Sequence, residues 1–354
     1  INKRIKLIMA YTTINKSSSF MNNKLYTGNG GTNAITGVGF QPDWSWIKNR
    51  SGADNHALYD AVRGVNKILS SNNTNDESTQ SDGLATFDTD GFTVGADGKV
   101  NTNGNNFVAW NWKANGQGSS NTAGSINTTY TSVNTTAGFS ISTYTGTGSA
   151  ATVGHGLGVL PSMIIIKSRS KTGQNWITWH KAFTGNNEYV ELNTTDAKDT
   201  YDMIDNTSNT TSVFAISGDG NVNENGATYV AYCFADVQGY SRTGSFTVNG
   251  NSTNMIYTGF RPSFLLMKQY SSTSGNAQWG VFDNTRAGYN GKNNFLYAND
   301  SAAEDASNAQ TLDFLSNGFR LYGEYVSAKA GESNIYYAVG QTLVGTNGIT
   351  NNAR

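Results

Sequence analysis

The sequence predicts an all-β protein made of three tandem domains, each a β-sandwich or jelly-roll-like unit. Short apolar runs at residues 44–48, 163–167 and 264–268 are bounded by turn residues, as buried strands are. Stretches such as "NNFVAWNW" and "ATYVAYCF" are rich in aromatic and β-branched residues, which suit a pleated sheet. Asp-Gly, Gly-Asp and Asn-Gly pairs recur at the spacing of hairpin turns.

Each apolar run follows one of the only three prolines in 354 residues. Proline fixes φ and lacks an N–H, so it suits the first residue of a strand rather than the middle. A lysine stands six positions after each proline, and we expect it to leave the sheet with its stem along apolar surface. The prolines are Pro42, Pro161 and Pro262, and the lysines are Lys48, Lys167 and Lys268. Their spacing indicates a unit of about 100 residues that occurs three times.

The chain divides around these units. Residues 117–138 are mostly Gly, Ser, Thr and Asn, which predicts a polar linker. Residues 55–69 are the one helix-like stretch, and Met9 is the expected translation start, with residues 1–8 an upstream extension. The expected division is an N-terminal arm (1–24), domain 1 (25–116), the linker (117–138), domain 2 (139–241), domain 3 (242–345) and a C-terminal tail (346–354).

Composition excludes several classes of protein. The 24 Lys and Arg nearly balance the 25 Asp and Glu, which argues against a nucleic-acid partner and against a polybasic membrane-surface protein. No apolar run approaches the roughly 18 residues of a membrane span. The single cysteine, Cys233, excludes an internal disulfide and is expected to be a buried small hydrophobe.

Residues that could carry catalysis are few. The three histidines do not have metal-binding spacing, so we expect no metal, no cofactor and no enzyme. Glycoside hydrolysis would need two carboxyl groups about 5–9 Å apart in a cleft. The candidate pairs Asp88/Asp90 and Glu304/Asp305 lie in turn-like sequence, so a polysaccharide depolymerase is the least favoured function.

Two Asp-x-x-Arg motifs have a structural and a functional interpretation. They comprise Asp60 with Arg63 and Asp283 with Arg286. Each pair could pin a turn through a bidentate contact, which is the favoured interpretation, or could clamp the hydroxyl groups of a sugar.

Tryptophans are the other candidates for ligand contact. The Trp-x-Trp pairs at Trp44/Trp46 and Trp110/Trp112 share a strand face, and a core layer is favoured over an exposed platform for sugar rings. Trp176 and Trp179 lie near a turn, which makes them and the adjacent His180 better candidates for an exposed glycan contact. For His180, packing against Trp179 in the core or at its rim is the favoured interpretation.

Several motifs together resemble a known family. "YTTINKS", "KLYTGNGGTNAITGVGFQPD", "WIKNRSGADNHALYDAVRG" and "NGNNFVAWNWKANG" are similar to the tandem β-rich repeat domain of tailed-phage virion proteins, especially in marine cyanophages and pelagiphages. The resemblance covers the chain from Met9 and implies a virion exterior location, on a tail fibre or the capsid surface, with other virion proteins as partners. It supplies no catalytic residues.

Two functions follow as expectations. The favoured one is a non-catalytic tail-fibre or receptor-binding adhesin, a homotrimer that contacts host surface polysaccharide. The alternative is a capsid decoration protein or another exterior structural protein.

Overall fold

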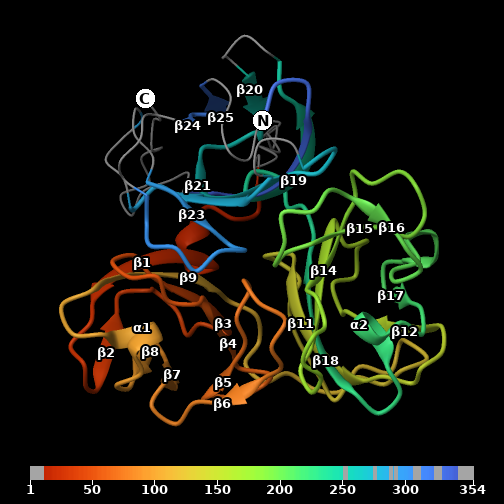
Figure 1. Ribbon diagram of the computed structural model, residues 1–354, viewed down its shortest axis with the longest axis horizontal. Helices are drawn as coiled ribbons and strands as arrows, with labels where there is room; N and C mark the ends of the chain where they lie inside the picture. Colours follow the sequence, from red (N-terminus) through yellow and green to blue (C-terminus); the bar gives the residue numbers. More distant parts are fainter. Residues whose placement is uncertain are drawn as a thin grey trace, which may run out of the picture.

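The computed structural model describes residues 12–249, 254–273, 277–286, 290, 294–305, 312–322 and 329–341 (Figure 1). The expected start at Met9, residues 1–8 and the tail 346–354 lie outside these residues. As expected, the described chain is all-β, with several antiparallel sheets and only very short helices. The helical turns are η1 (Ser17–Ser19), α1 (Gly98–Asn101), η2 (Asn206–Ser208) and α2 (Gly220–Asn223).

Three large sheets form the frame of the molecule. The first contains, in spatial order, β1 (Met21–Thr27), β9 (Asn106–Trp112), β3 (Trp44–Asn49) and β4 (Ala57–Asp60). The second contains β10 (Tyr130–Asn134), β11 (Phe139–Thr145), β18 (Thr228–Phe234), β13 (Met163–Ser168), β14 (Ile177–His180), β15 (Glu188–Glu191) and β16 (Asp199–Thr200). The third contains β19 (Ser241–Thr247), β26 (Ser333–Gly340), β21 (Pro262–Gln269), β22 (Trp279–Asp283) and β23 (Leu296–Tyr297).

The three large sheets share a strand order. We call the residues that each sheet spans the first segment (21–112), the second segment (130–234) and the third segment (241–340). In each segment the last strand of the large sheet lies between an early strand and the strand at the proline. The strand at the proline pairs in turn with the strand that follows it in the chain. The resulting orders are β1-β9-β3-β4, β11-β18-β13-β14 and β19-β26-β21-β22. Pro262 is the first residue of β21, and the other two prolines stand just before β3 and β13, as expected from their missing N–H.

A smaller sheet covers one face of each large sheet. The smaller sheets are β2 (Asn33–Thr36) with β8 (Gly91–Val94) and β7 (Leu84–Asp88), β12 (Ala151–Gly154) with β17 (Val213–Ile216), and β20 (Asn254–Tyr257) with β25 (Gly318–Leu321) and β24 (Leu312–Leu315). The first segment also contains a short antiparallel pair of strands, β5 (Lys67–Ile68) and β6 (Ser78–Thr79). Apolar side chains fill the space between the layers, for example Phe92 against Ile47 in the first segment, which gives the sandwich character predicted.

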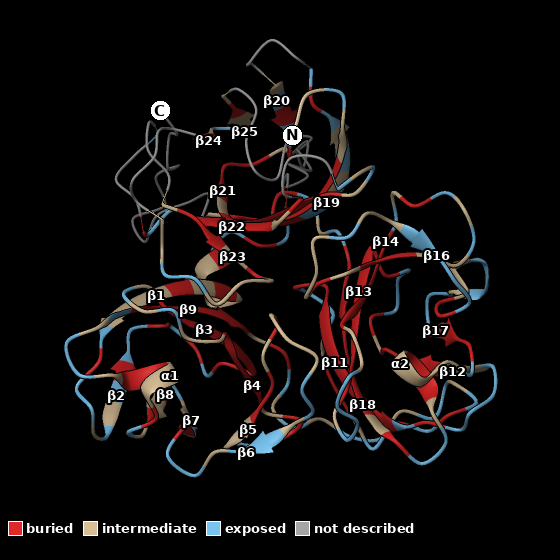
Figure 2. Ribbon diagram, in the orientation of Figure 1, coloured by how far each residue is buried: buried red, intermediate tan, exposed pale blue. Residues whose placement is uncertain are grey.

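The other faces of the three large sheets meet in one aromatic core at the centre of the molecule. Ring centroids lie 4.6 Å apart for Trp44 and Tyr232, 5.2 Å for Trp112 and Phe264, and 4.7 Å for Phe234 and Tyr337. Each of these pairs joins two different segments, and Figure 2 shows the buried strands facing the middle. The Trp-x-Trp pairs therefore form a core layer, the favoured interpretation. The three segments share this core, and the first and third segments each bury a further apolar cluster of their own.

The stretch that follows β5, β15 or β23 contacts the next segment. Glu77 of the first segment receives two hydrogen bonds of 2.9 Å from the guanidinium of Arg169 in the second, and its N–H donates to the Arg169 carbonyl. Glu304 of the third segment pairs in the same way with Arg50 of the first, at 2.7 and 2.8 Å. The third segment is thereby joined back to the first.

The remaining clasp replaces the ion pair with a ring contact. Lys198 of the second segment donates its backbone N–H to the carbonyl of Tyr270 in the third, at 2.8 Å, and its ammonium lies 5.8 Å from that ring. All three segments are thus linked in a closed ring.

Two expectations about local structure were wrong. Residues 55–69 form β4 and β5 rather than a helix, because Gly64 turns the chain at φ +94° and β4 pairs with β3. Residues 117–138 are not a free linker: they contain β10, paired with β11, and the buried Ile126. The hydroxyl groups of Thr128, Thr131 and Ser142 hydrogen bond in a buried chain, which lets a polar segment join the sheet.

The expectation that the three lysines leave the sheet was also wrong. Lys48, Lys167 and Lys268 are buried. Each Nζ donates to carbonyl oxygens of the loop that follows its strand, such as that of Gly52 (3.1 Å), Gln174 (2.7 Å) and Ala277 (2.6 Å). Burial lowers the pKa of Lys48 and of Lys167 to about 8 and that of Lys268 to about 7.

Candidate functional site

The first Asp-x-x-Arg motif holds two segments together. Asp60 lies opposite Trp44 on β4, and its carboxylate accepts from Arg63 Nε at 2.5 Å and from the Arg63 backbone N–H at 2.8 Å. The Tyr232 hydroxyl of the second segment donates to the same carboxylate at 2.7 Å. Both side chains of the ion pair are 0% exposed, so the structural interpretation is correct and a sugar clamp here is wrong.

The second motif occupies the corresponding position of the third segment. Asp283 accepts from Arg286 Nε at 2.6 Å, and Trp110 of the first segment donates its indole N–H to Asp283 at 2.9 Å. Neighbouring Arg286 and the hydrogen bonds hold the pKa of Asp283 below its usual range although burial opposes this. These side chains are also 0% exposed and cannot meet a glycan.

The predicted glycan contacts on β14 are likewise buried. Trp176 donates its indole N–H to the carbonyl of Ser70 in the first segment, at 2.9 Å. His180 Nε2 lies 3.2 Å from the Tyr336 carbonyl of the third segment, and burial lowers its pKa to about 4. Trp179 is 4% exposed. Trp176 and His180 therefore contact other segments, whereas Trp179 lies on the opposite face of the strand from His180. All three are buried, so none of them offers an exposed platform.

The carboxylates considered for hydrolysis have structural partners. Asp90 accepts from the backbone N–H groups of Gly37 and Gly39, at 3.0 and 2.6 Å, and so closes a turn. Asp88 accepts from the hydroxyl of Thr93 at 2.8 Å. Glu304 forms ion pairs with Arg50 and Arg286. The backbone of Asp305 exchanges hydrogen bonds with the backbone of Phe295. None of these four acids is among the residues that line the cleft described next.

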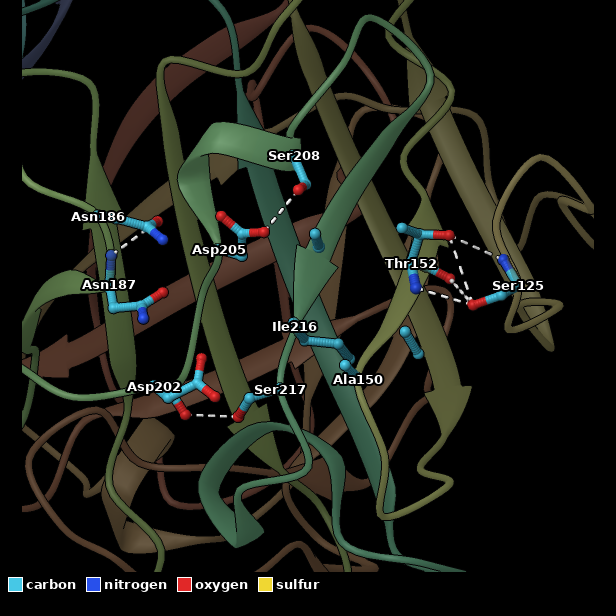
Figure 3. A pocket seen from close by; sticks show the side chains of 12 residues that line it. Ser125, Ala150, Thr152, Asn186, Asn187, Asp202, Asp205, Ser208, Ile216 and Ser217 are labelled. Carbon is cyan, nitrogen blue, oxygen red and sulfur yellow. Dashed lines mark hydrogen bonds between the residues drawn. The ribbon is translucent and has the colours of Figure 1, made fainter.

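The structure instead places a cleft of about 530 Å³ on the outer side of the second segment (Figure 3). It opens between the small sheet of β12 and β17 and the stretch that contains η2. The lining residues are Ser125, Ala150, Ala151, Thr152, Asn186, Asn187, Asp202, Asp205, Ser208, Ala215, Ile216 and Ser217.

The cleft exists because the second segment departs from the strand pattern of the other two. In the first segment β7 pairs with β8 along four positions, whereas the stretch beside β17 makes only one bridge, from Ile204 to Ile216. The chain then leaves the sheet in η2, which keeps a gap between this stretch and the sheet. On the other side Ser125 and Thr152 exchange two backbone-to-hydroxyl hydrogen bonds of 2.9 Å.

One carboxylate of the cleft is held in its charged form. Asp205 accepts from the hydroxyl of Ser208 at 2.5 Å and from the hydroxyl of Thr207 at 2.6 Å. These hydrogen bonds lower the pKa of Asp205 below its usual value, and the bond from Ser208 has the larger effect. Asp202 lies at the same wall with an exposed side chain, and its backbone carbonyl accepts from Ser217.

Asn187 belongs to this wall, and Tyr201 is joined to it by a backbone hydrogen bond. Asn187 has a left-handed backbone at φ +59°, and its N–H donates to the side chain of Asn206 at 3.0 Å. Its side-chain oxygen is buried without a hydrogen-bond partner in the protein. Tyr201, next to Asp202, is 57% exposed and donates its N–H to the Asn187 carbonyl.

Sequence reasoning missed this cleft. Residues 117–138, which we expected to be a linker, supply Ser125. The signal for the other wall was "DNTSNTTS" (205–212), a polar run between two expected strands where the first segment has the tight turn after Asp88. A run without apolar periodicity predicts only a loop, so the residue pattern alone gave no cleft.

Two further searches cover the described residues only. They contain no group of three or more His, Cys, Asp or Glu placed to hold a metal ion. None of their helices has the length and apolar character needed to cross a membrane.

Comparison with known proteins identifies a family of unknown function. Curated proteins gave no match. A family model described as a domain of unknown function, DUF7483, matches residues 16–342. Because this match spans well over half of the chain, the protein belongs to the DUF7483 family.

Proposed function

We propose that the protein is a non-catalytic adhesin on the exterior of a phage virion, on a tail fibre, and that it binds surface polysaccharide of the host. The resemblance of its motifs to tailed-phage virion proteins supports the location. The second-segment cleft supports binding and is the observation that carries the proposal.

The cleft has the chemistry that a sugar needs. Amide, hydroxyl and carboxylate groups of Asn186, Asn187, Ser208 and Asp205 can exchange hydrogen bonds with sugar hydroxyl groups. Ile216 and three alanines supply apolar surface for the faces of the ring. Ligand sites commonly combine apolar lining with a few placed polar groups in this way.

Binding is favoured over hydrolysis. A glycosidase needs one carboxylic acid with a raised pKa to protonate the leaving oxygen. The pKa of Asp205 is instead lowered by its hydroxyl donors, which keeps it a poor proton donor near neutral pH. A depolymerase predicts new reducing ends when the protein is incubated with host polysaccharide, whereas an adhesin leaves the polymer intact.

The test of the function combines location and binding. Gold-labelled antibody against the chain should mark tail fibres, and the purified protein should bind host polysaccharide in a pull-down. Labelling over the capsid without polysaccharide binding would replace the adhesin with a capsid decoration protein. A homotrimer is the expected state, and sedimentation equilibrium would give the mass of one chain if this expectation is wrong.

A further inference from the structure

Resting on the proposed function, we infer that the second-segment cleft selects uncharged or amino-bearing sugars and rejects acidic ones. The inference follows from the negative charge of the cleft, from its two acceptor-only carboxylates and from the exposed ring of Tyr201, which precedes Asp202 in the chain.

The charge of the cleft is negative. Asp202 and Asp205 are the only ionisable residues among those that line it, and no Lys, Arg or His accompanies them. Their carboxylates would repel the carboxylate of a uronic acid and attract the ammonium of an amino sugar. At a separation of a few ångströms, one unit charge changes affinity by about tenfold or more near a protein surface.

Two of the side chains that line the cleft are carboxylates, which act only as acceptors when ionised. The side-chain oxygen of Asn187 is buried and has no hydrogen-bond donor within the protein. Ionised carboxylates such as those of Asp202 and Asp205 accept hydrogen bonds and cannot donate them. Sugar hydroxyl and amino groups supply donors, whereas a ligand carboxylate would bring a further acceptor.

An exposed ring lies beside these acceptors. Tyr201 is 57% exposed and is tied to the cleft by its backbone bond to Asn187. Stacking on Tyr201 would hold the apolar face of a pyranose while its hydroxyl groups meet the carboxylates.

A glycan array with neutral, amino and uronic-acid oligosaccharides tests the inference. Neutral or amino sugars should bind, and uronic-acid probes should bind at least tenfold more weakly. Asp202→Asn should weaken amino-sugar binding about tenfold and improve the binding of acidic probes, and Tyr201→Ala should weaken binding of every retained sugar. Asp199→Asn is the matched control, since Asp199 is exposed on β16 and outside the lining.

The outcomes separate this inference from the proposed function. Preferred binding of uronic-acid probes would overturn the inference while leaving an adhesin in place. Binding that Asp202→Asn and Tyr201→Ala do not change would move the site away from the cleft and would also overturn it. No binding of any oligosaccharide class, with native circular dichroism, would overturn the proposed function itself.

Discussion

Replacing Lys268 with methionine should change how the stability of the protein depends on pH. Lys268 is buried in β21, and its Nζ donates to the carbonyl of Ala277 at 2.6 Å. Burial lowers its pKa from 10.5 to about 7, although the charges of Asp196 and Glu191 act in the other direction. The unfolded chain therefore holds this proton over a pH range in which the folded chain has lost it.

The sign and size of the effect follow from that difference. Between pH 7 and 10.5 the unfolded state binds more protons, so the free energy of unfolding rises with pH. A pKa lowered from 10.5 to about 7 corresponds to roughly 5 kcal/mol of disfavour for the charged form. Between pH 7 and pH 9 the wild-type protein should gain about 2 kcal/mol relative to Lys268→Met.

Urea unfolding of both proteins at half-unit steps from pH 7 to 9 measures this gain. Lys48 and Lys167 are present in both proteins, so their own titration cancels in the comparison. Lys171→Met is the control, because 45% of the Lys171 side chain is exposed and its removal should leave the slope with pH unchanged. If the wild-type and Lys268→Met stabilities stay parallel over this range, the buried amine does not lose its proton on folding and the reasoning fails.

Three further predictions concern the buried polar groups and the shared core. Because burial lowers the pKa of His180 to about 4 from 6.5, stability should fall by about 2 kcal/mol more in wild type than in His180→Gln between pH 6.5 and 4.5, measured by urea unfolding. Asp283→Ala leaves the Arg286 guanidinium buried without its carboxylate and should cost about 3–5 kcal/mol, whereas Lys181→Ala at an exposed pair should cost about 1 kcal/mol or less; equal losses in thermal unfolding would contradict this. The second segment, residues 130–234, should aggregate in size-exclusion chromatography when it is expressed alone, because its aromatic face loses its partners. A stable monomer with native near-ultraviolet circular dichroism would show instead that this segment folds independently.

The fold class could be predicted because it depends on local pattern. Apolar runs, turn pairs and the three prolines are properties of short stretches, and the strands after Pro42 and Pro262 lie where these patterns indicate. The destination of Lys48 could not be predicted in this way. Whether a lysine at the end of a strand reaches solvent depends on the loop that folds over it, and that loop offers carbonyl oxygens at positions without a sequence signature.

The candidate site illustrates the same limit. Trp176 and His180 look like a ligand contact because aromatic and imidazole side chains near a turn often are. In the folded chain their polar atoms meet carbonyl oxygens of Ser70 and Tyr336, which belong to other segments. Contacts between residues more than a hundred positions apart decide which aromatic side chains are buried, and a single sequence contains no record of them.

The ring arrangement also explains why the site should lie on an outer loop. The inward faces of the large sheets are occupied by the shared core, and Glu77 and Glu304 fix the loops that clasp neighbouring segments. A change at these positions disturbs two segments at once. The small sheets lie on the other faces of the large sheets, away from these contacts between segments. The chain around Asp205 can therefore leave the regular strand pattern while the large sheet beneath it stays intact. A surface that is free to vary is where recognition of a particular sugar can be built.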